Sequence, residues 1–292
     1  MKRTPDTVLL NVTGYIVIGF FGFITVLPFY VLVISSFTSE NFIINHGYSL
    51  FPGEFSLEAY KLVFKNPQRI LMAYLITIYK TVLGTALSLF LSSMAAYVMY
   101  RKDVKYRNQL AFFLYFTTLF SGGLAPYYIL VSSGLHLKNT ILVQILVPLF
   151  NVMNILILRN FIRGSIPDSL VECSKIDGCN DFIIFIKIIL PLSKPALASI
   201  GLFTALGYWN DWWSAMMFVQ RTNLQPMQYV LHSILSSVNV AANIVNQVPS
   251  LEMPKESLKV AMTVISTGPI LFLYPFVQKY FVKGITLGAV KG

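Results

Sequence analysis

The chain has 292 residues, of which 55% are hydrophobic and only 12% are charged. Its mean hydropathy is +0.67, whereas about a quarter of the residues in a soluble domain are charged. A purely water-soluble protein is excluded, and we expect an all-α membrane protein. The net charge of +10 is spread over loops beside apolar segments, which favours membrane lipid over nucleic acid as a partner.

Six apolar segments are long enough to cross the hydrocarbon core as helices, which takes about 20 residues each. They cover residues 12–35, 70–100, 110–131, 141–158, 195–219 and 258–282. The first exceeds the apolar core of a cleaved signal peptide, so we expect a retained anchor. Together the six segments predict one transmembrane domain over residues 1–292.

The lysines and arginines are unevenly divided between the predicted loops. With the N-terminus inside, the inner segments carry fourteen of them and the outer segments seven, and Lys80 within the second segment completes the 22. Because positive residues accumulate in cytoplasmic loops, this division predicts that both termini are cytoplasmic.

Lys80 lies at membrane depth, where an ionisable side chain is costly unless it faces water or a partner. Small polar residues such as Thr77 and Thr81 lie beside it. Lys80 either faces a transport path or snorkels toward the outer surface along its aliphatic stem. The sequence leaves both interpretations open.

A short helix is predicted in the loop between the fourth and fifth segments. Ser165, three residues before Asp168, and Pro167 in the first turn are typical of a capped helix start. Gly178 predicts the helix end, because glycine readily adopts the left-handed conformation found there. These signals indicate a helix of about three turns over residues 166–177.

The predicted helix is amphipathic. Its apolar side chains recur at helical spacing on one side, at Leu170, Cys173 and Ile176. Its charged side chains lie on another side, at Asp168, Glu172 and Lys175. One face is therefore suited to the groove of a partner protein. The alternative is an interfacial helix that lies on lipid headgroups and does nothing more.

The spacing in this loop resembles the EAA motif in permease subunits of binding-protein-dependent ATP-binding-cassette (ABC) importers. That motif has Glu-Ala-Ala, three residues, Gly, nine residues, Ile, one residue and Leu-Pro. The matching positions here are Glu172, Gly178, Ile188, Leu190 and Pro191, and Cys173 and Ser174 replace the two alanines.

The resemblance covers roughly residue 70 to the C-terminus. AAYVMYRK at residues 95–102, SGGLAPYYILVSSGLHLKNT at 121–140 and YWNDWW at 208–213 resemble carbohydrate-uptake permeases, the class that includes the smaller maltose permease subunit. Within that class, SGGLAPYYIL and the ending KGITLGAVKG most resemble the subgroup that imports oligosaccharides.

The resemblance implies a type I ABC importer architecture, with six transmembrane helices and a cytoplasmic coupling helix in the loop 162–194. It implies a heterodimer with a second related permease subunit, two cytoplasmic ATPase subunits and an extracytoplasmic solute-binding protein, in a bacterial cytoplasmic membrane. The residues expected to couple the chain to the ATPase are Ser165, Pro167, Asp168, Leu170, Glu172, Cys173, Ile176, Asp177 and Gly178.

We do not expect this chain to be an enzyme. It has no GxxxxGK[ST] phosphate-binding loop, so ATP and magnesium would be held by the partner ATPase and no cofactor is expected in the chain. No HExxH motif is present, and the three histidines stand apart from metal-ligand spacing. Metal sites and catalytic residues are therefore not expected.

The fifth segment carries Asp211, a carboxylate that is costly at membrane depth unless it faces a cavity or a partner. Aromatic side chains, which suit the apolar face of a sugar ring, surround it at Tyr208, Trp209, Trp212 and Trp213. We predict a sugar path there, to which Lys80 would add a preference for an acidic sugar such as a uronate. The alternative is an interfacial aromatic belt with Asp211 in water.

An ion-coupled secondary transporter is the alternative function. It would need ion-coupling groups within the spans, and only Lys80 and Asp211 qualify. No inverted repeat is apparent in the sequence. The importer permease is therefore the favoured function.

Overall fold

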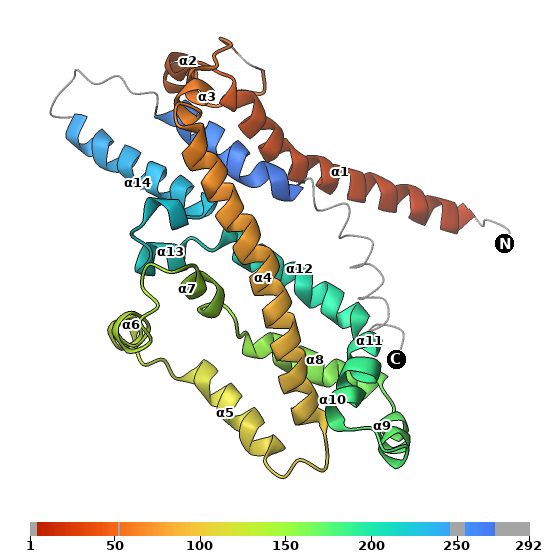
Figure 1. Ribbon diagram of the computed structural model, residues 1–292. Helices are drawn as coiled ribbons and strands as arrows, with labels where there is room; N and C mark the ends of the chain where they lie inside the picture. Colours follow the sequence, from red (N-terminus) through yellow and green to blue (C-terminus); the bar gives the residue numbers. More distant parts are fainter. Residues whose placement is uncertain (1–4, 52, 246–254, 272–292) are drawn as a thin grey trace. The chain divides into compact units, whose positions relative to one another are not determined.

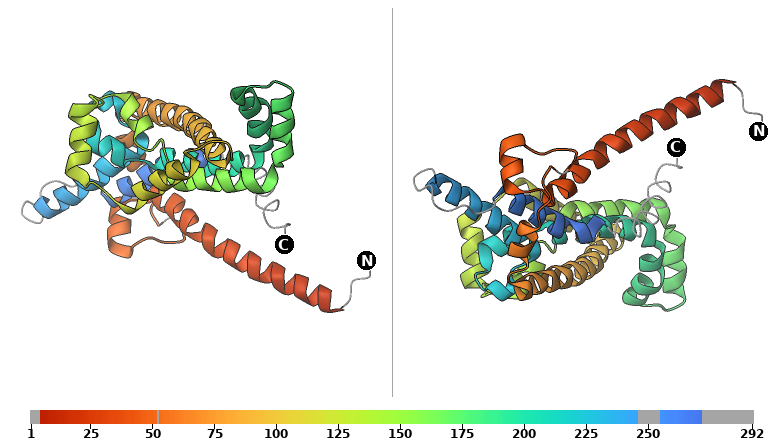
Figure 2. Two further views of the ribbon diagram at one scale, coloured as in Figure 1. Left: turned by 90° about the horizontal axis from the view of Figure 1, so that it is seen from below. Right: turned by 90° about the horizontal axis from the view of Figure 1, so that it is seen from above.

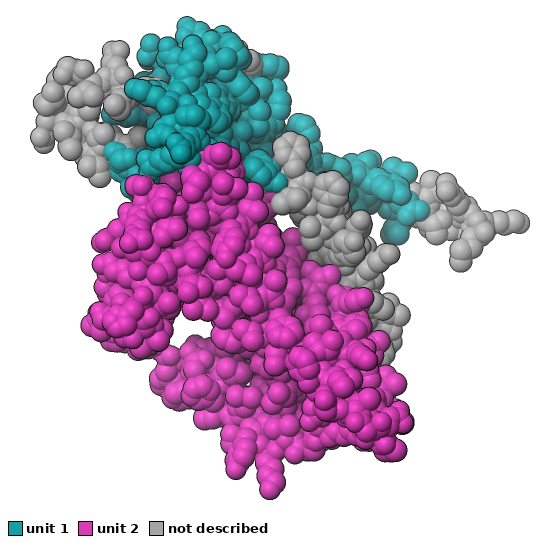
Figure 3. Space-filling view, in the orientation of Figure 1, with its two compact units in different colours: residues 1–70, 231–269 teal, residues 71–230, 270–292 magenta. Residues whose placement is uncertain are grey.

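The computed structural model describes residues 5–51, 53–245 and 255–271 (Figure 1). Their regular structure is helical, apart from one isolated bridge between Thr38 and Phe55. The chain forms two compact units, one from residues 1–70 and 231–269 and the other from residues 71–230 and 270–292 (Figure 3). The all-α prediction is confirmed for the described residues.

The first unit contains the long N-terminal helix α1, Pro5–Ser36, with the short helices α2, Glu40–His46, and α3, Glu58–Val63. The stretch Leu10–Ser36 is apolar and long enough to cross a membrane, and most of its large apolar side chains are exposed in the chain by itself, whereas Ser35 and Ser36 at its end are buried. This helix covers the first predicted segment, 12–35, and presents a surface suited to lipid or to another subunit.

Glu40 caps the start of another helix, formed by residues 256–271, whose first fourteen residues belong to the first unit. One carboxylate oxygen accepts from the N–H groups of Lys255 and Glu256 at 2.8 and 2.9 Å, and the other accepts from the N–H and hydroxyl of Ser257, both at 2.8 Å. Burial alone would raise the pKa of Glu40, but these hydrogen bonds outweigh it and lower the pKa. The carboxylate thereby satisfies donors that a helix start leaves free. Residues 272–282 of the sixth predicted segment lie outside the described residues.

The second unit is built along α4, Pro67–Tyr100, an apolar helix of 34 residues that covers the second predicted segment. The third predicted segment, 110–131, is instead broken. Helix α5, Arg107–Leu119, is followed by the helical stretch Leu124–Gly134, which begins with α6, Leu124–Ile129. The directions of α5 and of this stretch differ by 116°. Gly123 makes the break possible, because its φ of 87° lies in the left-handed region that favours glycine.

The fourth and fifth predicted segments are broken as well. The fourth contains α7, Ile141–Leu146, and α8, Val152–Ser165, where Asn151 caps α8 by accepting from two backbone N–H groups. The fifth contains α12 and α13, which are Lys194–Asn210 and Trp213–Phe218.

The remaining helices are η1 Leu130–Gly134, α9 Asp168–Ile176, α10 Asp181–Ile184, η2 Phe185–Ile189, α11 Leu190–Leu192, η3 Thr222–Leu224 and α14 Met227–Val245.

Six uninterrupted spans are therefore not found in the part of the chain that the structure describes. Leu10–Ser36 and Pro67–Tyr100 pass as single spans, and two bent helix pairs raise the number to four if each pair counts as one span. The total of six spans and the single domain over residues 1–292 stay predictions.

The core of the second unit joins the last turns of α4 to α8, η2 and α12. Met99, Ile155, Leu158 and Ile189 are completely buried within it. The short helices α9 and α10 lie at the same end of this unit as the last turns of α4, away from α6 and α13 (Figure 1 and Figure 2). The loop 162–194 is thus anchored directly to the longest helix of the unit.

Candidate functional site

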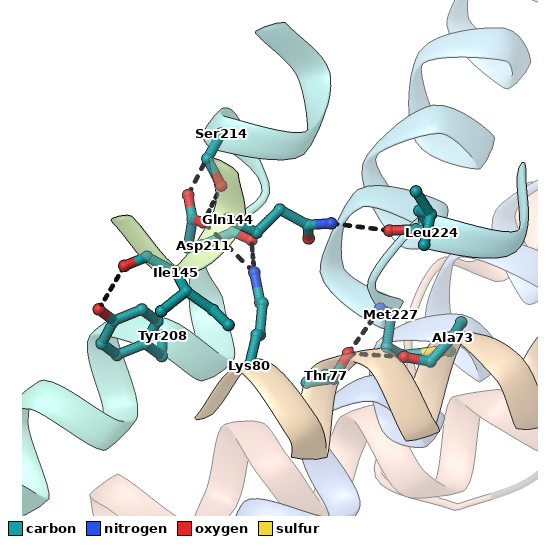
Figure 4. Close-up of polar contacts among 10 residues, drawn as sticks. All are labelled: Ala73, Thr77, Lys80, Gln144, Ile145, Tyr208, Asp211, Ser214, Leu224 and Met227. Atoms are coloured by element: carbon teal, nitrogen blue, oxygen red, sulfur yellow. Dashed lines mark hydrogen bonds and ion pairs between the residues drawn. The ribbon is translucent and has the colours of Figure 1, made fainter. Parts of the chain in front are cut away.

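Lys80 and Asp211 form a buried ion pair in the second unit (Figure 4). The Lys80 Nζ lies 2.6 Å from the backbone oxygen of Asp211 and 3.3 Å from its Oδ2. The Lys80 side chain is 0% exposed and the Asp211 side chain 15%. The alternative of a snorkelling lysine is wrong, because the ammonium turns inward to a carboxylate that offsets the cost of its burial.

Asp211 is held at the break between α12 and α13. The backbone is extended there, with φ −73° and ψ 102°, so that α12 ends at Asn210. The Asp211 carboxylate accepts from the backbone N–H of Ser214 at 3.1 Å and from the Ser214 hydroxyl. It therefore caps the start of α13 while it binds Lys80 on α4. One side chain fixes the position of three helices.

Other side chains satisfy backbone groups at or near the ends of neighbouring helices (Figure 4). These contacts are Thr77 Oγ1 accepting from Met227 N–H at 2.8 Å, Tyr208 hydroxyl donating to Ile145 oxygen at 2.8 Å, and Gln144 Nε2 donating to Leu224 oxygen at 2.9 Å. Irregular backbone at membrane depth is stable only when its polar groups are satisfied inside the protein. The breaks are therefore integral to this fold.

Gly84 allows α12 to lie close to α4. A Cβ on Gly84 would lie 2.5 Å from the ring of Tyr208, a distance that side chains do not tolerate. Tyr208 is only 1% exposed, so its ring has little room to move away. The glycine thus keeps the aromatic residue beside the Lys80–Asp211 pair.

A cavity of about 450 Å³ lies beside this pair, and we call it the central cavity. It brings together four of the predicted path residues, Tyr208, Asp211, Trp212 and Trp213. Its other polar lining residues are Ser88, Thr204, Asn151, Asn154 and Asn210, and sequence reasoning missed the three asparagines. Lys80 and Trp209 are buried and do not line it. Amides, hydroxyls and indole rings facing one space are the groups that bind a sugar.

The signal for two of the missed residues was present in the sequence. Pro148 interrupts the fourth apolar segment, and Asn151 and Asn154 follow it within two turns. An asparagine just beyond a proline break is typical of a helix cap. Asn154 donates from Nδ2 to the Thr204 hydroxyl at 3.3 Å, which ties α8 to α12.

The helix α9 starts differently from the prediction. It has nine residues, Asp168–Ile176, in place of three full turns, and Pro167 precedes it without a side-chain capping bond. Ser165 is the last residue of α8 and does not cap α9. The Asp168 carboxylate is instead bound by Lys102 Nζ and by the Tyr100 hydroxyl, each at 2.5 Å. Tertiary partners therefore replaced the predicted local cap.

The end of α9 agrees with the prediction. Gly178 has a φ of +79°, and its N–H donates to the Lys175 oxygen at 3.0 Å. The N–H of Cys179 donates to the Ser174 oxygen at 2.9 Å. These two bonds form a Schellman motif, which satisfies carbonyl groups at a helix end.

The two sides of α9 differ in burial. Val171 is 7% exposed and packs in the core of the unit. On the predicted apolar side, Leu170 is 43% and Ile176 85% exposed, and Cys173 is exposed with them. Glu172 and Asp177 are exposed as well. An apolar stripe with flanking carboxylates is thus available to a partner.

A charge network that sequence reasoning missed joins α9 to the end of α4. Arg101, 6% exposed, donates to the Tyr97 hydroxyl at 2.7 Å, to Asp181 at 2.5 Å and to Asp103. Lys175 of α9 also donates to Asp103, at 2.6 Å. The hydrogen bonds from Arg101 and then Lys175 hold the pKa of Asp103 well below its usual range. The sequence showed Arg101 only as one of many loop charges.

Residues 88–287 match the family described as the binding-protein-dependent transport system inner membrane component. The chain belongs to this family. The permease is 41% identical over 273 residues to the polygalacturonan/rhamnogalacturonan transport system permease protein YtcP of Bacillus subtilis (strain 168), covering 93% of this chain and 94% of that one. It is 38% identical to protein LplC of the same organism, over 100% of this chain and 98% of LplC.

A solved structure is also similar to this permease. It is the crystal structure of a bacterial ABC transporter involved in the import of the acidic polysaccharide alginate. One of its chains matches with a TM-score of 0.78 and 28% identity, covering 96% of this chain and 99% of that one. The family expected from the loop motif is therefore confirmed, and the permease is an inner-membrane transport component.

Proposed function

We propose that this permease is one of two related membrane subunits of an oligosaccharide importer driven by ATP hydrolysis on separate ATPase subunits. The observation that carries the proposal is α9, whose buried side is anchored to the core through Val171 while Leu170 and Ile176 face outward. The names of its relatives support the substrate class, because one relative transports polygalacturonan and rhamnogalacturonan and a similar structure imports alginate.

The proposed coupling route runs from α9 into α4. The exposed apolar side of α9 enters a groove on an ATPase subunit, as amphipathic helices do. When ATP binding draws the ATPase subunits together, α9 follows its groove. Lys175 and Asp103 pass the movement to Arg101 at the end of α4. Because α4 also carries Lys80, the movement reaches the break between α12 and α13.

The central cavity is the proposed sugar contact of this subunit. Its amides and hydroxyls pair with sugar hydroxyls, and Trp212 and Trp213 cover the apolar face of a ring. Among the described residues that line it, Asp211 is the only one charged at neutral pH, and Lys80 offsets that charge. Lys80 is therefore a structural partner of Asp211, and the hypothesis that it selects a uronate loses its main support, since its side chain is 0% exposed.

The remaining partners follow from the family. A solute-binding protein delivers the sugar from outside, and a second permease subunit completes the path. We place both termini and α9 on the cytoplasmic side, on the argument of the lysine and arginine division. Two ATPase subunits there hold the ATP and magnesium.

The test is to purify the tagged permease gently from its native membrane and identify the proteins that accompany it. We expect an ATPase and a second permease subunit. In proteoliposomes this complex, with its binding protein, should take up labelled oligogalacturonides only when ATP is present on the ATPase side. A chain that purifies alone and transports under an ion gradient would contradict the proposal and establish the secondary transporter.

A further inference from the structure

A second cavity, which we call the basic cavity, lies where the end of α4, the start of α5 and the end of α8 meet. Its volume is about 520 Å³. Its charged lining residues are four cations and one carboxylate: Lys102, Arg107, Arg159, Arg163 and Asp168. Asn108 and Ser165 add neutral polar groups. The lining therefore carries an excess of three positive charges.

The single carboxylate is already committed. Asp168 pairs with Lys102 at 2.5 Å and accepts from the Tyr100 hydroxyl at 2.5 Å. The Lys102 hydrogen bond, followed by that of Tyr100, lowers the pKa of Asp168, so it remains ionised. Within the described residues, no carboxylate lies within 4.0 Å of the guanidinium groups of Arg107, Arg159 or Arg163.

Three guanidinium groups without a carboxylate within 4.0 Å line one polar space and repel one another, although Asp168 attracts Arg163 from a longer distance. Arg107 and Arg159 are half-buried. An anion in the cavity would remove that repulsion. Guanidinium groups present a planar fork of donors that matches the oxygens of a phosphate. The lining is thus suited to an anionic group such as a phosphate.

The surface beside the cavity indicates where the phosphate comes from. Helix α5 begins at Arg107 and continues as an apolar helix. Its side chains Phe112, Phe113 and Phe116 are 67%, 62% and 43% exposed. A phosphate that carries hydrocarbon chains can place its headgroup among the arginines and its chains along these rings. Basic pockets between membrane helices bind anionic lipid headgroups in this way.

We propose that the basic cavity binds the headgroup of an anionic phospholipid, with its acyl chains along α5. Ile166, Pro167 and Asp168 also line the cavity, so the headgroup lies directly beside the start of α9. The bound lipid would steady the first residues of the coupling helix, where a local side-chain cap is absent.

The binding test uses the complex purified through the tagged permease in a neutral detergent. Dioctanoyl-phosphatidylglycerol, dioctanoyl-phosphatidylcholine and inorganic phosphate are added separately, and Tm and bound lipid are measured, the latter by native mass spectrometry. We expect phosphatidylglycerol to raise Tm with concentration and to stay bound, since a ligand of the folded state stabilises it. Phosphatidylcholine and inorganic phosphate should have much smaller effects. An equal effect of inorganic phosphate would overturn the lipid in favour of a soluble anion.

The variant test removes two of the cavity cations, in Arg159→Gln/Arg163→Gln. Each guanidinium gives charge-assisted hydrogen bonds, so the apparent affinity for phosphatidylglycerol should fall roughly tenfold or more. The matched control is Lys105→Gln/Lys187→Gln, which removes the same charge from exposed side chains outside the cavity. The control should bind as the parent does.

Three outcomes would overturn the proposal. Unchanged binding in the arginine variant would show that the cavity does not hold the lipid. An equal loss of lipid affinity in the arginine variant and in the control would show that net charge alone causes the effect. If the arginine variant retained the lipid but lost the ATPase from the purified complex, these arginines would bind an acidic surface of the ATPase. Because binding is read without transport, these outcomes are distinct from a failure of the importer proposal.

Discussion

Helix α4 carries two ion-pair sites that use the same chemistry in different surroundings. Near its middle, Lys80 and the Asp211 carboxylate are 0% and 15% exposed. At its end, Arg101 is 6% exposed, but its carboxylate partners Asp103 and Asp181 are 53% and 64% exposed. In the middle Lys80 is shut off from water and Asp211 meets only the central cavity, whereas at the end each carboxylate is more than half exposed. Burial of both partners, more than the number of pairs, therefore decides what a broken pair costs.

The largest effect should come from breaking the buried pair. Lys80→Gln or Asp211→Asn leaves one buried charge without its partner, which costs about 3–5 kcal/mol of unfolding free energy. The double variant Lys80→Gln/Asp211→Asn leaves neither charge. Its loss of unfolding free energy should be much smaller than the sum of the losses in the two single variants. Unfolding of the detergent-solubilised permease, followed by loss of helical signal in denaturant, measures all three variants.

An exposed cation provides the control for this cycle. Lys61→Gln removes one positive charge from an exposed side chain and should change the unfolding free energy by less than about 0.5 kcal/mol. If the double variant loses as much unfolding free energy as both single variants together, Lys80 and Asp211 act independently. The interpretation as a pair then fails.

Gly178→Val tests the end of α9. The left-handed φ of +79° strains a β-branched residue, at a cost of about 1–2 kcal/mol, although open space surrounds the site. We expect the turn to shift and ATP hydrolysis to become uncoupled from sugar uptake. ATP hydrolysis should then continue while transport stops. The measurement compares both rates in proteoliposomes.

Gly178→Asn is the matched variant, because asparagine tolerates the left-handed conformation. It should retain most of the coupled transport. Normal uptake by Gly178→Val, or an equal defect in both variants, would show that backbone conformation at this turn does not control coupling.

Asp103→Asn should have a smaller effect on stability, below about 1 kcal/mol, because the carboxylate is 53% exposed. Arg101 keeps Tyr97 and Asp181 as partners, whereas Lys175 loses its ion pair. We expect weaker coupling with an intact fold, measured as the ratio of sugar imported to ATP hydrolysed. A large loss of Tm would instead assign Asp103 a place in the core network.

The smallest effect concerns pH. The pKa values of Asp103 and Asp168 are lowered in the folded chain, below the value of about 3.9 for an unfolded aspartate. Their stabilisation is therefore fully present above that value and is lost as the pH falls through the folded pKa. The Tm difference between the parent and Asp103→Asn/Asp168→Asn should stay constant from about pH 5.5 to 8 and shrink below about pH 4. A steady change across the neutral range would contradict the assigned shifts.

Short-range patterns in the sequence predicted features that depend on neighbouring residues. Hydropathy predicted α1 and α4 as long apolar helices, because one uninterrupted segment is enough for each. Gly178 predicted the end of α9, because a left-handed residue is chosen by its own backbone. The spacing from Glu172 to Pro191 predicted the family, which the match over residues 88–287 confirmed.

The sequence by itself thus determined the membrane environment, the all-helical class, the end of α9 and the family. Only the tertiary structure decided which charges pair, since Lys80 and Asp211 lie 131 positions apart along the chain, and it decided that Asp168 turns to Lys102 in place of capping α9. It also decided where three apolar segments break, and beside one of these breaks the Tyr208 hydroxyl satisfies the Ile145 oxygen. Thr77 and Gln144 bind backbone groups of Met227 and Leu224, which lie outside those segments. Local propensity depends on adjacent residues, whereas the burial of a charge or a carbonyl group depends on what the rest of the fold places beside it.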